Sequence, residues 1–301
     1  MVFKIIKILI YHKMTTTLCL VAIFKNESHI LKEWIEHYLN QGVDKIFLID
    51  NGSTDSYYSI LQPYISSGKV DLVKDNKKYA QVELYNKHFL SKCKAYDWVI
   101  VCDLDEFIYG RKYCNSIKDF LNKVHPSFSQ VFIPWKMFGS NGYDTMEQEQ
   151  PSSVISTFTK RINNDDIRHN KFRSFIHKGT LKYINCKTII RTKHLLKIGI
   201  HHYETSNNRF MTSYVSQNNH ISITREFAEI NENIIDNSAL HLNHYAIQSF
   251  KWFMDVKATR GAADVATSDN VRNKEYFKEY DLNDIDDNEL SNITNNKDML
   301  N

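Results

Sequence analysis

The chain has 301 residues, 42% of them hydrophobic and 24% charged, and its formal net charge is +3 at pH 7. These proportions are ordinary for a soluble globular protein and leave room for one large domain or two small ones. The net charge is too small to indicate nucleic-acid binding, so we expect no nucleic-acid partner. Five cysteines without metal-type spacing favour a reducing compartment.

Residues 1–16 are predicted to form an N-terminal extension. The apolar run at 5–11 is much shorter than the ~20 residues of a membrane span, and Lys7 interrupts it. The segment also lacks the small residues of a signal-peptide cleavage site. An edge strand, a weak interfacial anchor and an upstream extension before Met14 are all compatible with it. We therefore expect a cytoplasmic chain, soluble or peripherally membrane-associated, with membrane contact only through this segment.

Strand and helix patterns alternate between residues 17 and 107. Apolar runs typical of buried strands cover 17–24, 45–49, 70–73 and 98–107. The segments between them have helical periodicity: one helix ends before Gly42, a short one carries residues 60–65, and a third runs from about 80 to 96. This alternation predicts right-handed βαβ units and a largely parallel sheet, which is an α/β fold.

The run from Trp98 to Phe107 reads as a buried strand that ends in three acids. Because strand side chains alternate between faces, Asp103 and Asp105 should point the same way. Neighbouring carboxylates repel each other, and a divalent cation that prefers oxygen ligands, such as Mg²⁺ or Mn²⁺, removes that penalty. Ligands of open α/β sheets bind at this end of the strands. We interpret Asp103 and Asp105 as a metal site for a phosphate-bearing ligand; the alternative is two solvated or helix-capping acids.

Beyond residue 107 the pattern is looser. A strand is predicted at 130–135, a loop at 137–142, short strand-like pieces over 157–203 and a last helix from about 246 to 259. Between 281 and 301 there are six acids, one lysine and few apolar residues, which predicts a frayed or disordered end. The expected organisation is an extension at 1–16, one domain at 17–261 and an acidic, Asn/Asp-rich tail at 262–301.

Three predicted strand ends, at 25–27, 50–52 and 103–105, should meet at one edge of the parallel sheet. The chain has no Gly-x-Gly-x-x-Gly after its first strand and no Gly-x-x-x-x-Gly-Lys-Ser/Thr motif. This pattern argues against dinucleotide oxidoreductases and P-loop enzymes.

Taken in order, these motifs resemble glycosyltransferase family 92 and the neighbouring family 2-like transferases of the GT-A fold. The resemblance covers about residues 17–261 and rests on these stretches: Ala22 to Glu27, Glu33 to Tyr38, Gly42 to Asp44, Asp50 to Asp55, Asp103 to Phe107, Trp135 to Gly142, Lys187 to Arg191, His201-His202, and His244-Tyr245 followed by Ser249, Phe253, Lys257 and Arg260-Gly261. It implies a GT-A-type, Rossmann-like αβα sandwich with a mostly parallel central sheet. It also implies a nucleotide-sugar donor, usually a UDP-sugar, with Mn²⁺ (or Mg²⁺) bridging its diphosphate to the two aspartates.

The resemblance further implies roles for single residues near the metal and the phosphates. His244 would complete the metal shell; the alternative is a buried, hydrogen-bonded histidine. Lys257 and Arg260 would face the phosphates, unless they lie on a solvated helix face.

On the nucleoside side, the resemblance implies that Asp50 hydrogen-bonds the uracil or ribose. Lys25, Asn26, Glu27 and Asn51 would lie close by. N-capping and turn chemistry is the alternative for these positions.

The resemblance suggests that Trp135, His201 and His202 contact the acceptor. For Trp135, a tryptophan of the hydrophobic core is an equal alternative. Family resemblance also suggests inversion at the sugar carbon, which requires a base for the acceptor hydroxyl. An acid from 144–149 could supply it, and we take Glu149, with a solvated loop as the alternative.

The function predicted from the sequence is a metal-dependent glycosyltransferase. It would move a hexose from a nucleotide sugar to a glycan, a glycoprotein or another hydroxyl acceptor, with inversion. One alternative is a catalytically silent nucleotide-sugar or glycan-binding module on the same fold. A metal-dependent phosphohydrolase is a further alternative, but that chemistry wants Asp-x-Asp-x-Thr/Val, and Phe107 occupies the fifth position.

Overall fold

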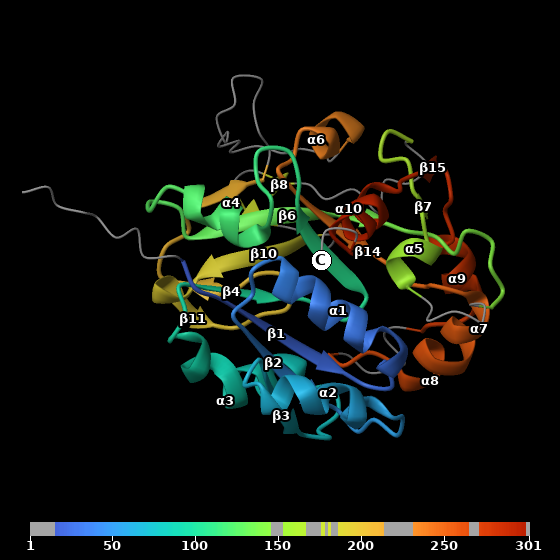
Figure 1. Ribbon diagram of the computed structural model, residues 1–301, viewed down its shortest axis with the longest axis horizontal. Helices are drawn as coiled ribbons and strands as arrows, with labels where there is room; N and C mark the ends of the chain where they lie inside the picture. Colours follow the sequence, from blue (N-terminus) through green and yellow to red (C-terminus); the bar gives the residue numbers. More distant parts are fainter. Residues whose placement is uncertain are drawn as a thin grey trace, which may run out of the picture.

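The computed structural model describes residues 16–145, 153–166, 176–177, 180–181, 186–213, 231–264 and 271–298. Most of the extension at 1–16 and the predicted base Glu149 lie outside these ranges. The main sheet has nine strands in the order β3-β2-β1-β4-β10-β6-β14-β5, with β13 also paired to β6. Figure 1 shows this sheet rising from β3 at the bottom of the view to β6 and β14 near the top.

The first half of the sheet follows the predicted βαβ pattern closely. Its elements are β1 (Leu18–Phe24), α1 (Ser28–Asn40), β2 (Lys45–Asp50), α2 (Tyr57–Ser66), β3 (Val70–Lys74), α3 (Gln81–Cys93) and β4 (Trp98–Val101). The four strands pair in parallel throughout. The predicted strands and helices of this region are therefore confirmed.

The second half of the sheet mixes directions. It consists of β5 (Glu106–Gly110), β6 (Gln130–Met137), β10 (Cys186–Arg191), β13 (Phe210–Thr212) and β14 (Leu240–His244). Strand β10 is antiparallel to both β4 and β6, and β14 is antiparallel to β5. On its other side β6 pairs in parallel with β13 and then with β14. Parallel pairings predominate, so the predicted α/β class with a mostly parallel sheet is confirmed.

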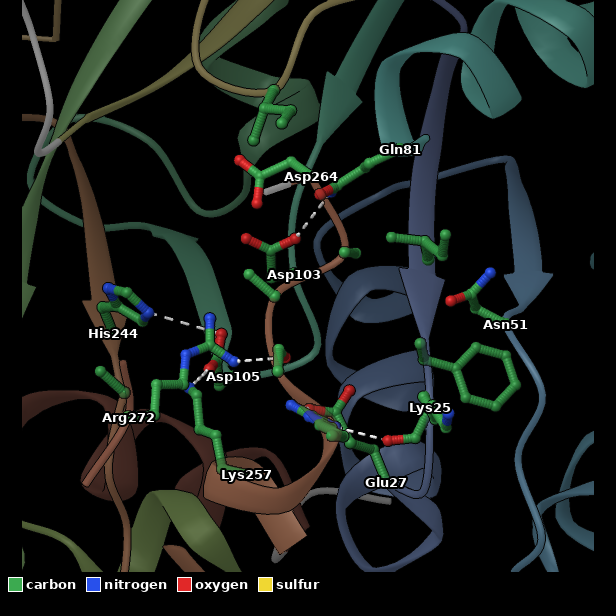
Figure 2. Close-up of a pocket in the computed structure, with 18 of the residues that line it drawn as sticks. Lys25, Glu27, Asn51, Gln81, Asp103, Asp105, His244, Lys257, Asp264 and Arg272 are labelled. Atoms are coloured by element: carbon green, nitrogen blue, oxygen red, sulfur yellow. Dashed lines mark hydrogen bonds and ion pairs between the residues drawn. The ribbon is translucent and has the colours of Figure 1, made fainter. Parts of the chain in front are cut away.

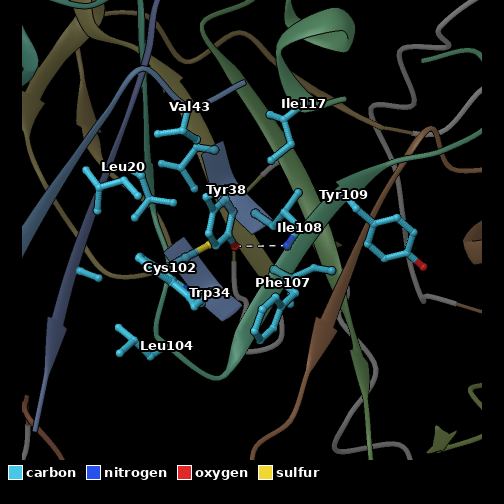
Figure 3. Packing of buried hydrophobic residues seen from close by; sticks show 14 of the residues in the cluster. Leu20, Trp34, Tyr38, Val43, Cys102, Leu104, Phe107, Ile108, Tyr109 and Ile117 are labelled. Atoms are coloured by element: carbon cyan, nitrogen blue, oxygen red, sulfur yellow. Dashed lines mark hydrogen bonds between the residues drawn. The ribbon is translucent and has the colours of Figure 1, made fainter. Parts of the chain in front are cut away.

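Helices cover both faces of the parallel strands, because the side chains of each strand alternate between two cores. Leu20 of β1 packs in the cluster that contains Trp34 and Tyr38 of α1 (Figure 3). Val21 points to the other face, into the cluster that contains Phe89 of α3. The result is the expected αβα layering.

The predicted strand from 98 to 107 is in fact two strands, which corrects the sequence analysis. Strand β4 ends at Val101 and β5 starts at Glu106. Between them the Glu106 amide donates to the Asp103 carbonyl at 3.1 Å, and the Glu106 carboxylate accepts from the Asp103 amide at 2.9 Å. These bonds close a turn, which we call the acidic turn (residues 102–106). Strand alternation is therefore not what orients Asp103 and Asp105.

The predicted frayed tail is also wrong for the part of it that the structure describes. Residues 271–298 form α9 (Lys274–Tyr280), β15 (Ile285–Asp286) and α10 (Glu289–Asp298). Apolar Phe277 and Leu290 are buried. Asp287 pairs with two buried cations, Lys136 at 2.8 Å and Arg161 at 2.7 Å. Asp287 is a fixed counter-charge here rather than a solvated side chain.

The helix predicted at 246–259 begins later and is not the last one. It is a continuous helical run of α7 (Phe250–Trp252), a π-helical turn η3 (Phe253–Lys257) and α8 (Ala258–Arg260). In Figure 1 this run lies beside α9. No helix within the described ranges is both long enough and apolar enough to cross a membrane.

The remaining described elements are short. They are α4 (Ile117–Lys123), α5 (Val154–Thr157), β7 (Lys160–Arg161), β8 (Ile176–His177), β9 (Thr180–Leu181), η2 (Thr192–His194), β11 (Leu195–Lys197), β12 (Glu204–Thr205) and α6 (Glu232–Asp236).

Candidate functional site

A cavity of about 280 Å³ opens at the carboxyl ends of the parallel strands. All three predicted strand ends reach it: Lys25 and Glu27 after β1, Asn51 after β2, and Asp103 and Asp105 in the acidic turn (Figure 2). The helical run α7–α8, the segment 261–264 and α9 supply another wall. The convergence of these strand ends is therefore confirmed.

Two side chains of helix α1 hydrogen-bond to the backbone of the acidic turn. The indole Nε1 of Trp34 donates to the Asp103 carbonyl at 3.0 Å and to the Glu106 carbonyl at 3.2 Å. The Tyr38 hydroxyl donates to the same Glu106 carbonyl at 3.0 Å and accepts from the Ile108 amide at 3.1 Å (Figure 3). These bonds satisfy backbone groups that a turn would otherwise leave unpaired in the core. Two aromatic side chains thus fix where the acids of the turn can lie.

Asp103 lies beside a fully buried lysine. The Lys187 ammonium is 3.0 Å from Asp103 Oδ2 and 3.2 Å from Glu106 Oε2. Burial alone would raise the pKa of Asp103, but the Lys187 charge holds the pKa below its usual range. The amide of Gln81 is 3.5 Å from the other Asp103 oxygen. The Asp103 carboxylate is therefore kept ionised inside the protein.

Asp105 is paired in the same manner with a lysine from the opposite wall. Its Oδ2 accepts from the Lys257 ammonium, and its Oδ1 is 3.5 Å from His244 Nε2. Burial raises the pKa of Asp105, but Lys257 and His244 together hold the pKa well below the usual value. Asp105 Oδ1 and His244 Nδ1 are buried and have no hydrogen-bond partner. Unpartnered buried polar atoms of this kind are uncommon and mark a place where a ligand can bind.

A third ion pair closes the cavity near β1. Arg260 pairs with the Glu27 carboxylate and donates to the Lys25 carbonyl at 2.5 Å. Burial raises the pKa of Glu27, an effect that the neighbouring Arg260 opposes. Lys257 and Arg260 therefore face the cavity and not solvent.

Aromatic rings line the side of the cavity next to the acids. The Trp135 ring lies 4.4 Å from the His244 ring and 5.4 Å from the His201 ring, measured between centroids. Burial lowers the pKa of His201 to about 3, and Lys187 contributes to the same direction. His202 is exposed and is not among the described residues that line the cavity. The structure therefore groups Trp135 and His201 with His244 but leaves His202 outside.

The residues predicted near the nucleoside do not all line the cavity. Asp50 accepts from the Ser53 amide at 2.8 Å and from the Tyr57 hydroxyl at 2.6 Å, which is turn chemistry. Asn26 has a φ of +54° and accepts from the Thr54 amide at 2.7 Å. Neither is among the described lining residues, whereas Asn51 is.

Several lining or supporting residues were not singled out in the sequence. Lys187 was visible only as part of a motif, without a role. Arg272, Tyr276 and Tyr280 lie in the segment that composition assigned to a tail, yet they line the cavity. No local pattern could have placed them, because their contact with the site depends on how the chain returns after α8.

The donor set can be tested for a divalent metal. Within the described ranges, no group of three or more His, Cys, Asp or Glu side chains is arranged to hold a metal ion by itself. Two ionised carboxylates with one unpartnered oxygen nevertheless fit Mg²⁺ or Mn²⁺, which are commonly bound by one or two carboxylates plus substrate phosphates. Asp103 and Asp105, with His244 adjacent, are the residues that would hold such an ion.

Comparison with known proteins gives one extended match and several partial ones. The sequence profile of glycosyltransferase family 92 matches residues 14–293. A glycosyltransferase family 92 protein of Ricinus communis is 23% identical over 130 residues, which are 42% of this chain and 23% of that protein. The crystal structure of S. aureus TarS covers 58% of this chain and 28% of its own, at 17% identity and a TM-score of 0.35. Glucosyl-3-phosphoglycerate synthase from Mycobacterium tuberculosis, solved with Mn²⁺ and UDP, covers 40% of this chain and 44% of its own at 17% identity and a TM-score of 0.26. The chain thus spans about a quarter of the length of the Ricinus communis protein and of TarS, and less than half of the synthase.

Proposed function

Because this chain belongs to glycosyltransferase family 92, we propose that it transfers a hexose from a nucleotide sugar to a hydroxyl group. The donor is a UDP-sugar, the acceptor is a glycan or glycoprotein, and the sugar carbon is inverted. Mn²⁺ or Mg²⁺ on Asp103 and Asp105 is part of the same proposal.

The observation that carries the proposal is the pair of ionised aspartates, Asp103 half-buried and Asp105 buried, with basic groups around them. Asp103 and Asp105 both line the cavity, and Lys257 and Arg260 face it from the opposite wall. Breaking the bond to the sugar leaves negative charge on the departing diphosphate, and fixed cations stabilise that charge. A divalent metal, when bound, would supply the same kind of stabilisation as a Lewis acid.

The chain's own residues position the reactants in this proposal. Asp105 and Glu27 each pair with a cation of the helical run α7–α8, so Lys257 and Arg260 keep a fixed direction before the donor binds. The aromatic rings of Trp135 and His201 offer a face for sugar C–H groups. Glu149 stays a prediction for the base that takes the acceptor proton.

Thermal melting tests the proposal directly. The protein is heated with each of a panel of nucleotide sugars, with and without Mn²⁺, alongside Asp105→Ala. A ligand at about 100 times its dissociation constant adds ~2.7 kcal/mol, or roughly 5–10 °C for a domain of this size. We expect a metal-dependent shift with a UDP-sugar that the Asp105→Ala variant loses. Asp255→Ala is the matched control, because Asp255 is exposed and forms its ion pair with Lys251 on the same helical run.

Absence of any shift across the panel would remove the proposal. A nucleotide-sugar-binding module without catalysis is the second candidate. It is favoured because Lys257 already neutralises Asp105, and because two carboxylates are fewer ligands than a complete protein metal site has. Donor binding without release of nucleoside diphosphate, with or without an array of glycan acceptors, would select this candidate.

A further inference from the structure

Arg272 is a cation of the cavity that has no carboxylate partner among the described residues. Arg272 donates from Nη1 to the Gly261 carbonyl at 2.9 Å, and its Nε is buried without any acceptor. The side chain lines the cavity next to Lys257, with whose charge it interacts (Figure 2). A buried guanidinium N–H that has lost water and found no acceptor is unfavourable unless a ligand supplies one.

The charges of the site indicate what kind of ligand would supply the missing acceptor to Arg272. The pairs Asp103–Lys187, Asp105–Lys257 and Glu27–Arg260 each cancel. Among the described lining residues, Arg272 and Lys25 are the cations, and Asp264 the carboxylate, left without an ion pair. Of these two cations, Arg272 is the one with a buried donor that has no acceptor.

A guanidinium presents several N–H groups in a planar fork that matches two phosphate oxygens at once. The wall that carries Arg272 is also rigid. Tyr276 stacks on Phe253 at 5.8 Å and on Tyr280 at 4.2 Å between ring centroids. The stacked rings anchor the helix that follows Arg272, and the backbone bond to Gly261 orients the guanidinium before any ligand arrives.

We propose that Arg272 binds the diphosphate group of the nucleotide ligand in the cavity that Asp103 and Asp105 also line. This inference rests on the proposed function. A nucleoside diphosphate that carries one divalent cation is still anionic and needs a cation to hold it. With the three ion pairs cancelled and Lys25 balanced by Asp264, Arg272 is the cation left over. Arg272 supplies that charge without breaking an existing ion pair.

Titration calorimetry tests the assignment in the presence of Mn²⁺. The probes are UDP, GDP, ADP, CDP and inorganic pyrophosphate. The variants are Arg272→Gln, Arg272→Lys and the control Lys278→Gln, which removes the same charge from an exposed position of α9. We expect Arg272→Gln to weaken binding of the preferred nucleoside diphosphate and of pyrophosphate by roughly tenfold or more, as for loss of a charge-assisted hydrogen bond. Arg272→Lys should lose less, and Lys278→Gln should bind as the unmodified chain does.

The outcomes separate this inference from the proposed function. If the unmodified chain binds a nucleoside diphosphate and Arg272→Gln binds it within twofold, the inference is wrong and the function stands. If Arg272→Gln melts more than about 4 °C lower without ligand and Arg272→Lys restores no affinity, the residue is structural and the inference is again wrong. If no nucleoside diphosphate binds the unmodified chain but pyrophosphate does, and Arg272→Gln weakens it, the proposed function fails and the anion site remains.

Discussion

Replacing Asp287 by asparagine tests whether the acidic C-terminal segment is part of the folded domain. Asp287 Oδ2 accepts from Lys136 Nζ at 2.8 Å and from Arg161 Nε at 2.7 Å. Lys136 is 1% exposed, and its next carboxylate, Glu289, is 3.9 Å away. Arg161 keeps a two-bond contact with Glu232. The variant thus leaves mainly the Lys136 ammonium uncompensated, and removing one partner of a buried pair typically destabilises by ~3–5 kcal/mol.

Urea unfolding followed by circular dichroism measures this loss, and melting should fall by about 2–4 °C for each kcal/mol. Asp286→Asn is the matched control. Its side chain is 72% exposed and lies 4.0 Å from Lys160, so the expected change is below about 0.5 kcal/mol. Adding Lys136→Met to Asp287→Asn should recover part of the stability, because the buried charge is then gone. If Asp287→Asn and Asp286→Asn are equally mild, the segment does not dock as described.

Three further predictions concern the site and its surroundings. Trp34→Phe removes the indole donor to the acidic turn; we expect a loss of ~1–3 kcal/mol in urea and weaker UDP binding in calorimetry, and unchanged values would mean that Trp34 does not hold the turn. Burial and the Lys136 charge lower the pKa of His241 to about 4, below its unfolded value, so its stabilising contribution is complete above pH 6.5 and up to ~3 kcal/mol is lost as the pH falls to about 4. His241→Gln should reduce that pH dependence, and an unchanged slope would exclude His241 as a source. Asp105→Asn and Lys257→Met should each destabilise, and a double-mutant cycle should show a coupling of 0.5 kcal/mol or more; strict additivity would mean that the pair does not form in solution.

The first half of the fold could be predicted because its signals are local. Runs such as Leu18–Phe24 and Lys45–Asp50 are apolar on both faces, as strands buried between helices must be. The helix from Ser28 has its buried residues at helical spacing and ends before Gly42, whose φ is +89°. Each of these features is decided within about fifteen residues of chain, so tertiary contacts only reinforce it.

The site was harder to predict because it is assembled from distant segments. The sequence indicates that Asp103 and Asp105 lie together, but the reason is a turn bonded to Trp34, which lies 69 residues away from Asp103. The lysines that neutralise them come from β10 and from the π-helical turn, at separations of 84 and 152 residues. Pairings of this kind leave no periodic signal in a single sequence, because either partner alone looks like a solvated charge.

The acidic end of the chain was predicted wrongly for the same reason, because its partners also lie far away in the sequence. Many acids and few apolar residues normally indicate a segment that cannot bury enough surface to fold. That inference considers the charge of the segment alone, whereas here the charge is balanced by cations elsewhere in the fold. Asp287 neutralises Lys136 of β6 and Arg161 of β7, which are buried. Asp287 therefore anchors the segment that also contains Arg272 and the stacked tyrosines of α9. It follows that the stability of this segment and the affinity of the cavity are linked, so Asp287→Asn should weaken pyrophosphate binding although Asp287 is not among the described residues that line the cavity.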